Sequence, residues 1–373
     1  MRIVQLANFH TPTSGGLRVA VDTLRTGYAA AGHRCTLIVP GADDGEAGNA
    51  ETGAVRTLRS PKLPNGTDYR VIVRRRAVLA LLDELRPDVV EVHDKVLQHW
   101  IWAWSRARRV PVVAWSHERL ERTLPMLLPF VPGRVLRRAT SGIAGRVGRS
   151  CDLLVACSRF AADEFGPYAP VRIVRLGVEL SAFRPRVAVD RTDRLQLVLA
   201  ARLSPEKRPD LAVDALRVLH ERGVDAELTV LGHGPRHTKL AQSAAGLPVR
   251  FTGYLSDRDE VAAELSAADV ALAPAPAETF GLAALEALAC GTPIVAHQGA
   301  APAEIVARYP GAGAAAAGNP AAFADAVLRL AAVPRGTRRD AARRAAEAYP
   351  WSATISAMLD AHAELVEAAV TRR

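Results

Sequence analysis

The segments Ile3-Val-Gln-Leu-Ala7 and Cys35-Thr-Leu-Ile-Val-Pro40 are short apolar runs on either side of an amphipathic stretch from Leu17 to Ala31. Short apolar runs that end in polar or glycine-rich loops are typical of buried parallel strands, and the stretch between them predicts a helix. The alternation continues along the chain, with further apolar runs that start at Asp88, Val110, Leu153, Ile173, Leu195, Ala226, Val249, Val270 and Ile294. We therefore expect an α/β protein of successive doubly wound units, in which ligands bind at the carboxyl ends of the strands.

The length of the chain predicts two domains. A chain of 373 residues is too long for one ordinary core. The polar, proline-containing segment from Arg184 to Asp193 separates two runs of alternating strands and helices, which places a first domain at residues 1–186 and a second at 187–351. A helix expected over residues 352–373 has no strand after it, so we expect it to pack back across the first domain.

The composition excludes several classes of protein. A hydrophobic content of 49% with 23% charged residues describes a folded globular chain, and no stretch approaches the ~18 uninterrupted apolar residues of a membrane span. The cysteines lack CxxC or His-Cys spacings, which predicts reduced thiols, a cytoplasmic location and no metal site. The segment Gly232-His-Gly234 does not complete a GxGxxG fingerprint, which argues against a nicotinamide enzyme.

The net charge of +9 is unevenly distributed. Residues 1–186 hold 28 Arg or Lys against 17 Asp or Glu, whereas residues 187–373 hold 20 against 22. The basic half predicts an anionic partner, but the chain has no helix-turn-helix, zinc-finger or RNA-binding motif that would favour nucleic acid. A cluster of Arg70, Arg74, Arg75 and Arg76 could contact an anionic membrane, and a solvated basic surface is the alternative.

The segment Glu278-Thr-Phe-Gly-Leu-Ala-Ala-Leu-Glu286 carries two carboxylates around the start of a predicted helix. Glu278 lies in the loop after an apolar run, whereas Glu286 lies more than one turn into the helix. A separation of ~10 Å would prevent the two from sharing a proton but would let them hold two ends of one long, hydroxyl-rich ligand. The backbone N–H groups of Phe280, Gly281 and Leu282 would cap the helix and offer an anion site between the carboxylates.

Two cations, Arg202 and Lys207, lie in the loop after the first strand of the second domain. Because ligands collect at the carboxyl ends of such strands, the planar fork of Arg202 and the compact ammonium of Lys207 are candidates for binding phosphate. Only four of the 48 cationic residues are lysines, so Lys207 at this position is unusual for the chain. Solvated surface charge is the alternative interpretation.

The strand ends of the first domain carry further candidates: Ser14, Gly15, Gly16, His93, Asp94 and His117. The glycines follow the first strand and could cradle phosphate or admit an acceptor, because glycine permits close backbone approach. His117 could bond a substrate hydroxyl or exchange a proton, although a lone histidine is often structural. The pair His93-Asp94 ends the preceding strand and is a weaker candidate for acceptor contact.

Taken together, these motifs resemble the retaining glycosyltransferases of GT-B architecture, a large family that includes bacterial mannosyltransferases, sucrose-phosphate synthases and glycogen-synthase relatives. The resemblance covers the whole chain and rests on Ser14-Gly15-Gly16, His117, Arg202 with Lys207, and Glu278 with Glu286. It implies two Rossmann-like doubly wound domains that face each other across a deep cleft. The first would bind the acceptor and the second the nucleotide sugar, which is a co-substrate and not a resident cofactor.

The resemblance also implies roles for the second-domain residues. Arg202 and Lys207 would neutralise the departing diphosphate, together with the backbone amides of residues 280–282, without a metal ion. Glu278 would hold hydroxyls of the transferred sugar, and Glu286 would hold the ribose.

Three further contacts are implied. Gly16 would let the first domain approach the phosphates, the turn at Tyr254 would frame the nucleobase, and His117 would contact the sugar on the side that faces the acceptor. No Asp or Glu in these motifs is placed as a nucleophile, which favours front-face transfer with retention, in which the departing phosphate deprotonates the acceptor hydroxyl.

A narrower resemblance, in Val4-Gln-Leu-Ala-Asn-Phe-His10 and Ser116-His-Glu-Arg-Leu120, is to actinobacterial phosphatidylinositol mannoside mannosyltransferases. It implies transfer of mannose from GDP-mannose to an anionic glycolipid, by a protein that lies at the inner face of the cell membrane. The alternatives are transfer from a UDP-sugar to a soluble natural product, a non-catalytic sugar-nucleotide-binding protein, and a non-hydrolysing sugar-nucleotide epimerase.

Overall fold

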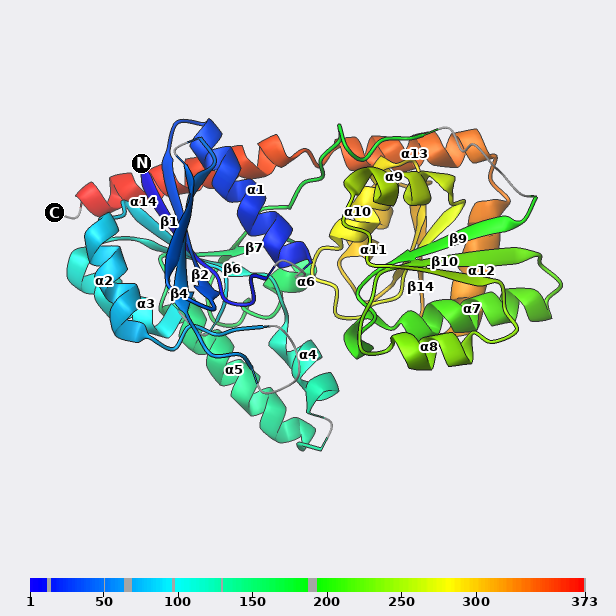
Figure 1. The fold of residues 1–373 in the computed structure, drawn as a ribbon, viewed down its shortest axis with the longest axis horizontal. Helices are drawn as coiled ribbons and strands as arrows, with labels where there is room; N and C mark the ends of the chain where they lie inside the picture. Colours follow the sequence, from blue (N-terminus) through cyan, green and yellow to red (C-terminus); the bar gives the residue numbers. More distant parts are fainter. Residues whose placement is uncertain are drawn as a thin grey trace. The chain divides into compact units, whose positions relative to one another are not determined.

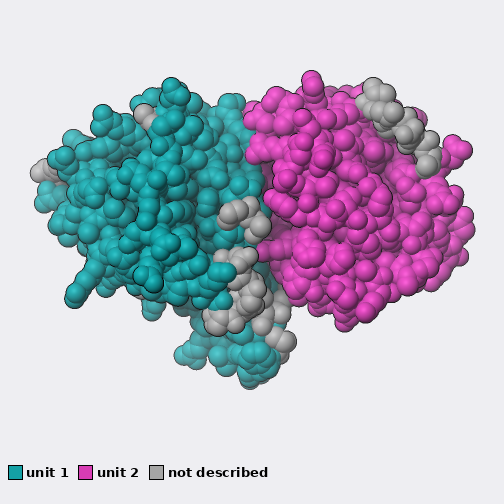
Figure 2. All heavy atoms as spheres, viewed as in Figure 1, with its two compact units in different colours: residues 1–175, 351–373 teal, residues 176–350 magenta. Residues whose placement is uncertain are grey.

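The computed structural model describes residues 1–11, 15–49, 51–63, 69–95, 98–128, 130–186 and 193–371, with the backbone alone at positions 98, 99, 126 and 127. The chain forms two compact units, which Figure 2 colours separately: residues 1–175 with 351–373, and residues 176–350. The last helix therefore belongs to the first unit, and the structural boundary at Arg175 lies before the expected residue 186. The expected linker falls largely on residues 187–192, outside the described residues.

The first unit is built on a sheet with the strand order β3-β4-β2-β1-β5-β6-β7-β8. Its strands are β1 (Arg2–Leu6), β2 (Arg34–Gly41), β3 (Gly45–Asn49), β4 (Gly53–Arg59), β5 (Val89–Val92), β6 (Val112–Ser116), β7 (Leu153–Ala156) and β8 (Val171–Ile173). All neighbouring strands pair parallel except β3 and β4. Each apolar run expected in this unit contains a strand. The sequence did not predict β3, which is polar and exposed along its whole length, or β4, whose apolar residues are interrupted by Arg56 and Thr57.

Two helices far apart in sequence, α1 (Gly16–Ala30) and α14 (Trp351–Thr371), pack against each other in the first unit. The hydroxyl of Thr354 on α14 donates to the carbonyl oxygen of Arg175 at 2.8 Å. Helices α4 and α5 project together beyond the sheet (Figure 1). The other helices of this unit are α2 (Arg75–Leu85), α3 (Gln98–Arg108), α4 (Leu120–Leu127), α5 (Gly133–Arg149) and α6 (Arg159–Ala162).

The second unit contains a parallel sheet with the strand order β11-β10-β9-β12-β13-β14. The strands are β9 (Leu195–Ala200), β10 (Ala226–Leu231), β11 (Val249–Gly253), β12 (Val270–Ala273), β13 (Ile294–His297) and β14 (Gly313–Ala316). All of these except β14 were expected. The run Gly313–Ala316 lacks β-branched or aromatic side chains, and its pairing with β13 makes it a strand.

Helices connect these strands as in a doubly wound unit. A 3₁₀ turn η1 (Pro205–Lys207) precedes α7 (Pro209–Glu221), and the later helices are α8 (His237–Ser243), α9 (Arg258–Ala267), α10 (Leu282–Ala289), α11 (Pro302–Arg308), α12 (Pro320–Ala331) and α13 (Arg335–Glu347). Asn319 caps α12 by accepting from the backbone N–H of Ala322 at 2.9 Å.

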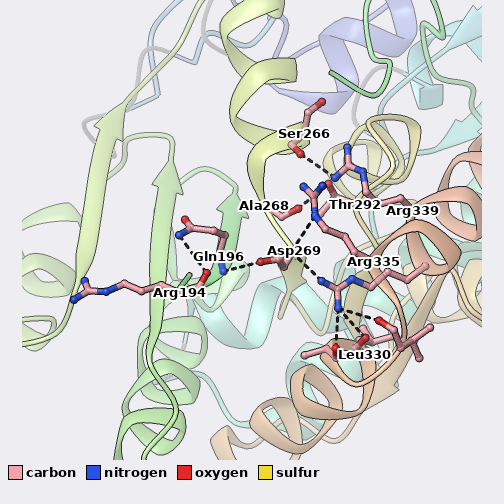
Figure 3. Close-up of polar contacts among 12 residues, drawn as sticks. Arg194, Gln196, Ser266, Ala268, Asp269, Thr292, Leu330, Arg335 and Arg339 are labelled. Atoms are coloured by element: carbon pink, nitrogen blue, oxygen red, sulfur yellow. Dashed lines mark hydrogen bonds and ion pairs between the residues drawn. The ribbon is translucent and has the colours of Figure 1, made fainter. Parts of the chain in front are cut away.

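A buried ion pair attaches α13 to the second sheet (Figure 3). The side chains of Asp269 and Arg338 are 2% and 5% exposed, and Nη2 of Arg338 lies 2.8 Å from Oδ1 of Asp269. The other oxygen of Asp269 accepts from the backbone N–H of Gln196 at 3.1 Å. Nε of Arg335 also donates to Oδ1 of Asp269, at 3.3 Å. Because a buried charge is costly when it is unpaired, Asp269 holds the helix at this position.

Replacement of Asp269 by alanine should therefore destabilise the second unit. We expect Asp269→Ala to lower the free energy of unfolding by about 3–5 kcal/mol, because it leaves the buried guanidinium of Arg338 uncompensated. Glu347→Ala, which removes an exposed partner of Arg343 on the same helix, should cost less than about 1 kcal/mol. Denaturant unfolding of both variants checks the prediction, and equal losses would contradict it.

Candidate functional site

The loops after β9 and β12 meet at the carboxyl edge of the second sheet, where these strands are neighbours. Nζ of Lys207 donates to Oε2 of Glu278 at 2.7 Å. Their side chains are 28% and 24% exposed, so the ion pair is partly shielded from solvent. The structure thus brings together two residues 71 positions apart that the sequence analysis had assigned to phosphate and to sugar separately.

The environment of Glu278 keeps its carboxylate ionised. Burial acts to raise its pKa, but the ammonium of Lys207 and the backbone N–H groups of Gly281 and Phe280 outweigh burial and lower the pKa below its usual value. Two of the amides expected to bind phosphate thus donate to Glu278. Gly281 has φ of +90°, and a Cβ there would lie 2.5 Å from Cγ of Pro302, so the turn requires glycine.

The second carboxylate, Glu286, has the opposite electrostatic character. It lies half-buried on α10, and burial raises its pKa to about 7, against the lowering effect of Arg258. The pKa of Glu278 is thus lowered and the pKa of Glu286 is raised, although the two carboxyl groups belong to one motif. Such a difference in pKa between two neighbouring carboxyl groups is typical of functional sites. Leu282 begins α10. The side chain of Phe280 is only 5% exposed and packs against Tyr349, so only its backbone could contact a ligand.

Arg202 extends toward solvent from the loop after β9. Its side chain is 45% exposed and lies 3.8 Å from Oε1 of Glu206. The neighbouring loop after β10 packs so closely against residues 201–203 that a Cβ at Gly232 would lie 2.1 Å from the carbonyl oxygen of Ala201. A Cβ at Gly234 would lie 2.5 Å from the carbonyl oxygen of Leu203. The sequence analysis noted these glycines only as an incomplete fingerprint, and the structure shows that they shape the loop of Arg202.

The turn after β11 lies next to that loop. The backbone N–H of Gly232 donates to the carbonyl oxygen of Gly253 at 2.8 Å, and Gly253 has φ of +73°. Tyr254, the following residue, is 56% exposed. Its assignment to the nucleobase stays a prediction.

His93 and His117 end neighbouring strands of the first sheet. Nδ1 of His93 and Nε2 of His117 lie 2.9 Å apart, and both rings stack with Trp115. His117 is half-buried, and burial together with His93 lowers its pKa well below the usual value, although Glu91 acts in the opposite direction. His117 is therefore neutral at physiological pH.

The remaining acceptor candidates differ in burial. Asp94 is 7% exposed, and Oδ2 accepts from the backbone N–H of Asn8 at 3.0 Å. Gly15 and Gly16 are exposed at the start of α1, and a Cβ at Gly15 would meet nothing within 4 Å. Packing therefore does not require glycine at position 15. Ser14 lies outside the described residues.

Sequence reasoning missed two buried charged residues near His117. Glu91 lies within β5 between apolar residues, and its carboxylate contacts His93. Lys95 pairs with Glu164 at 2.6 Å and donates to the carbonyl oxygen of Glu118 at 2.7 Å, which supports the segment that follows His117. A carboxylate inside the apolar run Val89-Val-Glu-Val92 was the signal for Glu91.

Part of the basic cluster is engaged within the first unit. Arg74 pairs with Asp44 at 2.7 Å, and Arg70 donates to the carbonyl oxygen of Ser60 at 2.6 Å. Arg75 and Arg76 are exposed at the start of α2. Contact of this cluster with a membrane stays a prediction. None of the helices within the described ranges is both long and apolar enough to cross a bilayer, and the described His, Cys, Asp and Glu side chains form no group of three that could hold a metal ion.

Both halves of the chain match known glycosyltransferase families. Residues 14–182 match the family described as Glycosyltransferase Family 4, and residues 194–332 match the family described as Glycosyl transferases group 1. The chain is 43% identical over 373 residues to a GDP-mannose-dependent alpha-(1-6)-phosphatidylinositol dimannoside mannosyltransferase of Mycobacterium tuberculosis, covering 96% of this chain and 95% of that protein. It is 30% identical to a glycogen synthase of the same species, covering 79% and 77% of the two chains.

Solved structures share the fold. The sucrose-phosphate synthase of Thermosynechococcus elongatus superposes with a TM-score of 0.81 at 18% identity, covering 98% of this chain and 99% of that one. The chain therefore belongs to glycosyltransferase family 4 and is a retaining glycosyltransferase with the GT-B fold. The resemblance identified from the sequence motifs is confirmed, and the separate roles of the site residues stay predictions.

The raised pKa of Glu286 should make stability depend on pH. The folded protein holds the proton of Glu286 up to about pH 7, whereas the unfolded chain releases it near its ordinary value of about 4.3. The stabilisation from this group is therefore present at low pH and is lost as the pH rises through 7.

Glu286→Gln removes this dependence. Relative to the native protein, we expect the variant to gain about 1–3 kcal/mol in unfolding free energy between pH 4.5 and 8. Denaturant unfolding across this pH range measures the difference. A difference that stays constant with pH would contradict the prediction.

Proposed function

We propose that this glycosyltransferase transfers mannose from GDP-mannose to a hydroxyl of a phosphatidylinositol mannoside and retains the anomeric configuration. The observation that carries the proposal is the 43% identity, across 96% of the chain, to a relative described as having this donor and this class of acceptor. The Lys207–Glu278 pair supports it, because it places a cation and a hydroxyl-binding carboxylate side by side at the carboxyl edge of the second sheet.

The second unit is proposed to bind the donor. Lys207 and Arg202 stabilise the diphosphate as it departs, since a compact ammonium and a planar guanidinium both bind phosphate oxygens. Glu278, kept ionised, accepts hydrogen bonds from hydroxyls of mannose. Glu286 accepts from the ribose hydroxyls in its ionised form, and donor binding would then lower its pKa.

The backbone around the start of α10 completes the donor site in this proposal. The amides of Phe280 and Gly281 hold Glu278 in place for the transferred sugar, and the amide of Leu282 donates to the diphosphate at the N-terminus of α10, where the aligned peptide dipoles favour negative charge. The exposed turn at Tyr254 faces the nucleobase. Gly16 allows close approach of the backbone to the phosphates.

The first unit is proposed to bind the acceptor. His117 forms a hydrogen bond with a hydroxyl of the transferred sugar on the side that faces the acceptor, and exposed Gly15 leaves room for the acceptor beside the start of α1. Asp94 and His93 lie at the same sheet edge, behind these positions. We propose that exposed Arg75 and Arg76 face the anionic surface that presents such a lipid.

Thermal unfolding in the presence of GDP-, UDP-, ADP- and TDP-sugars without divalent metal tests the donor assignment. We expect GDP-mannose at about 100 times its Kd to raise the Tm by ~5 °C, because a ligand that binds only the folded state stabilises it by mass action. Lys207→Met should abolish most of this shift, whereas Lys239→Met, which alters an exposed lysine on α8, should not. A selective response to a UDP-sugar would overturn the choice of donor.

A further inference from the structure

Glu91 is a buried carboxylate, and it has no role in the proposed function. It lies at the centre of the first sheet on β5, and its side chain is fully buried. Four polar groups from four different parts of the chain approach its two oxygens: Gln5 Nε2 at 2.8 Å, Tyr28 Oη at 2.9 Å, His362 Nε2 at 2.9 Å and His93 Nε2 at 3.2 Å. Gln5, Tyr28 and His93 form hydrogen bonds to the carboxylate, and His362 makes a close polar contact with it.

This environment keeps Glu91 ionised. Burial acts to raise its pKa, but polar contacts with His362 and His93 hold the pKa of Glu91 well below its usual value. Burial and the adjacent Glu91 also raise the pKa of Tyr28 well above its usual value, so the phenol keeps its proton and donates. An ionised carboxylate can only accept hydrogen bonds, so Nε2 of His93 carries a proton.

The proton on His93 determines the tautomer of His117. The side chain of His93 is fully buried, and a ring whose one proton is on Nε2 adds no charge to this buried cluster. With Nε2 protonated, Nδ1 of neutral His93 is an acceptor, so the nitrogen 2.9 Å away, Nε2 of His117, must donate to it. Burial and the ammonium of Lys95 lower the pKa of His117, which keeps this ring neutral. Its Nδ1 is then the acceptor nitrogen.

We propose that Glu91 and His93 are positioning residues, which hold His117 in the tautomer that presents Nδ1 as a hydrogen-bond acceptor to a substrate hydroxyl. The proposal rests on the proposed function in one respect, the contact between His117 and a hydroxyl of the transferred sugar. An acceptor nitrogen at a fixed position holds the sugar by one of its hydroxyls and so orients the carbon that is attacked. Stacking of Trp115 with both histidine rings fixes the planes in which this chain of hydrogen bonds lies.

The C-terminal helix contributes to this arrangement. His362 on α14 reaches Glu91 and makes an edge contact with Tyr28, with ring centroids 5.4 Å apart. The helix that returns to the first unit thus also places a polar side chain against Glu91.

Ring nitrogen NMR of ¹⁵N-histidine-labelled full-length protein tests the tautomer without any substrate. We expect the native protein at pH 7 to show His117 as a single neutral tautomer with the proton on Nε2. His93→Leu and Glu91→Met should each convert this signal to a mixture of tautomers, because the acceptor for Nε2–H is removed or no longer oriented. Tyr28→Phe, which alters only the other oxygen of Glu91, should leave the tautomer unchanged. His93→Leu carries the test if Glu91→Met does not fold.

Steady-state transfer from GDP-mannose supplies the second measurement. His93→Leu should lower kcat by about 10- to 100-fold, with the KM for GDP-mannose changed by less than about 3-fold. His93→Gln should recover most of the loss, since an amide can donate to Glu91 and accept from His117. Tyr28→Phe should retain kcat within about 3-fold.

The positioning role of Glu91 and His93 and the proposed function are contradicted by different results. A proton on Nδ1 of His117 in the native protein, an imidazolium at pH 7, or an unchanged tautomer in folded His93→Leu would overturn the positioning role. An unchanged kcat in folded His93→Leu would do the same. Absence of transfer from GDP-mannose by the native protein would instead overturn the proposed function, and the NMR result would still decide the tautomer.

Discussion

The parallel direction of the strands is the constraint on which the candidate site depends. In a parallel sheet the carboxyl ends of all strands lie at one edge, so loops far apart in the sequence meet there. In the second unit, Lys207 follows β9 and Glu278 follows β12, and Nζ of Lys207 lies 2.7 Å from Oε2 of Glu278. In the first unit, His93 follows β5 and His117 follows β6, and Nδ1 of His93 lies 2.9 Å from Nε2 of His117. The polar groups of each unit can act together because the strands before them pair in parallel.

The need to pair buried charges also fixes the C-terminal helices. Asp269 is paired with Arg338 on α13, and the polar groups around Glu91 include His362 on α14. Both carboxylates lie at or inside an apolar strand, and both meet groups from helices that come much later in the chain. A shift of α13 would leave the buried charges of Asp269 and Arg338 unpaired, at a cost of several kcal/mol. The same contacts therefore satisfy the charge and select the position of the helix.

The sequence predicted the fold class, most strands and the two runs of α/β structure, because short apolar runs between glycine-rich or polar loops are typical of buried parallel strands. It did not predict β3, β4 or β14, whose residues lack the continuous apolar pattern of buried strands. Among the site residues, it identified Glu278 and Lys207 but not their ion pair, because single-residue patterns do not reveal which loops become neighbours. Glu91 was visible as a carboxylate within an apolar strand, yet its partners Tyr28 and His362 come from helices whose packing only the tertiary structure shows.

The central claim is that this chain transfers mannose from GDP-mannose to a phosphatidylinositol mannoside and retains the anomeric configuration. The most direct test is NMR of the product formed from GDP-mannose and vesicles that contain phosphatidylinositol dimannoside. The account predicts a new mannose joined through an α-glycosidic bond, the configuration of the donor. A β-linked product, or transfer from another sugar nucleotide but not from GDP-mannose, would contradict it.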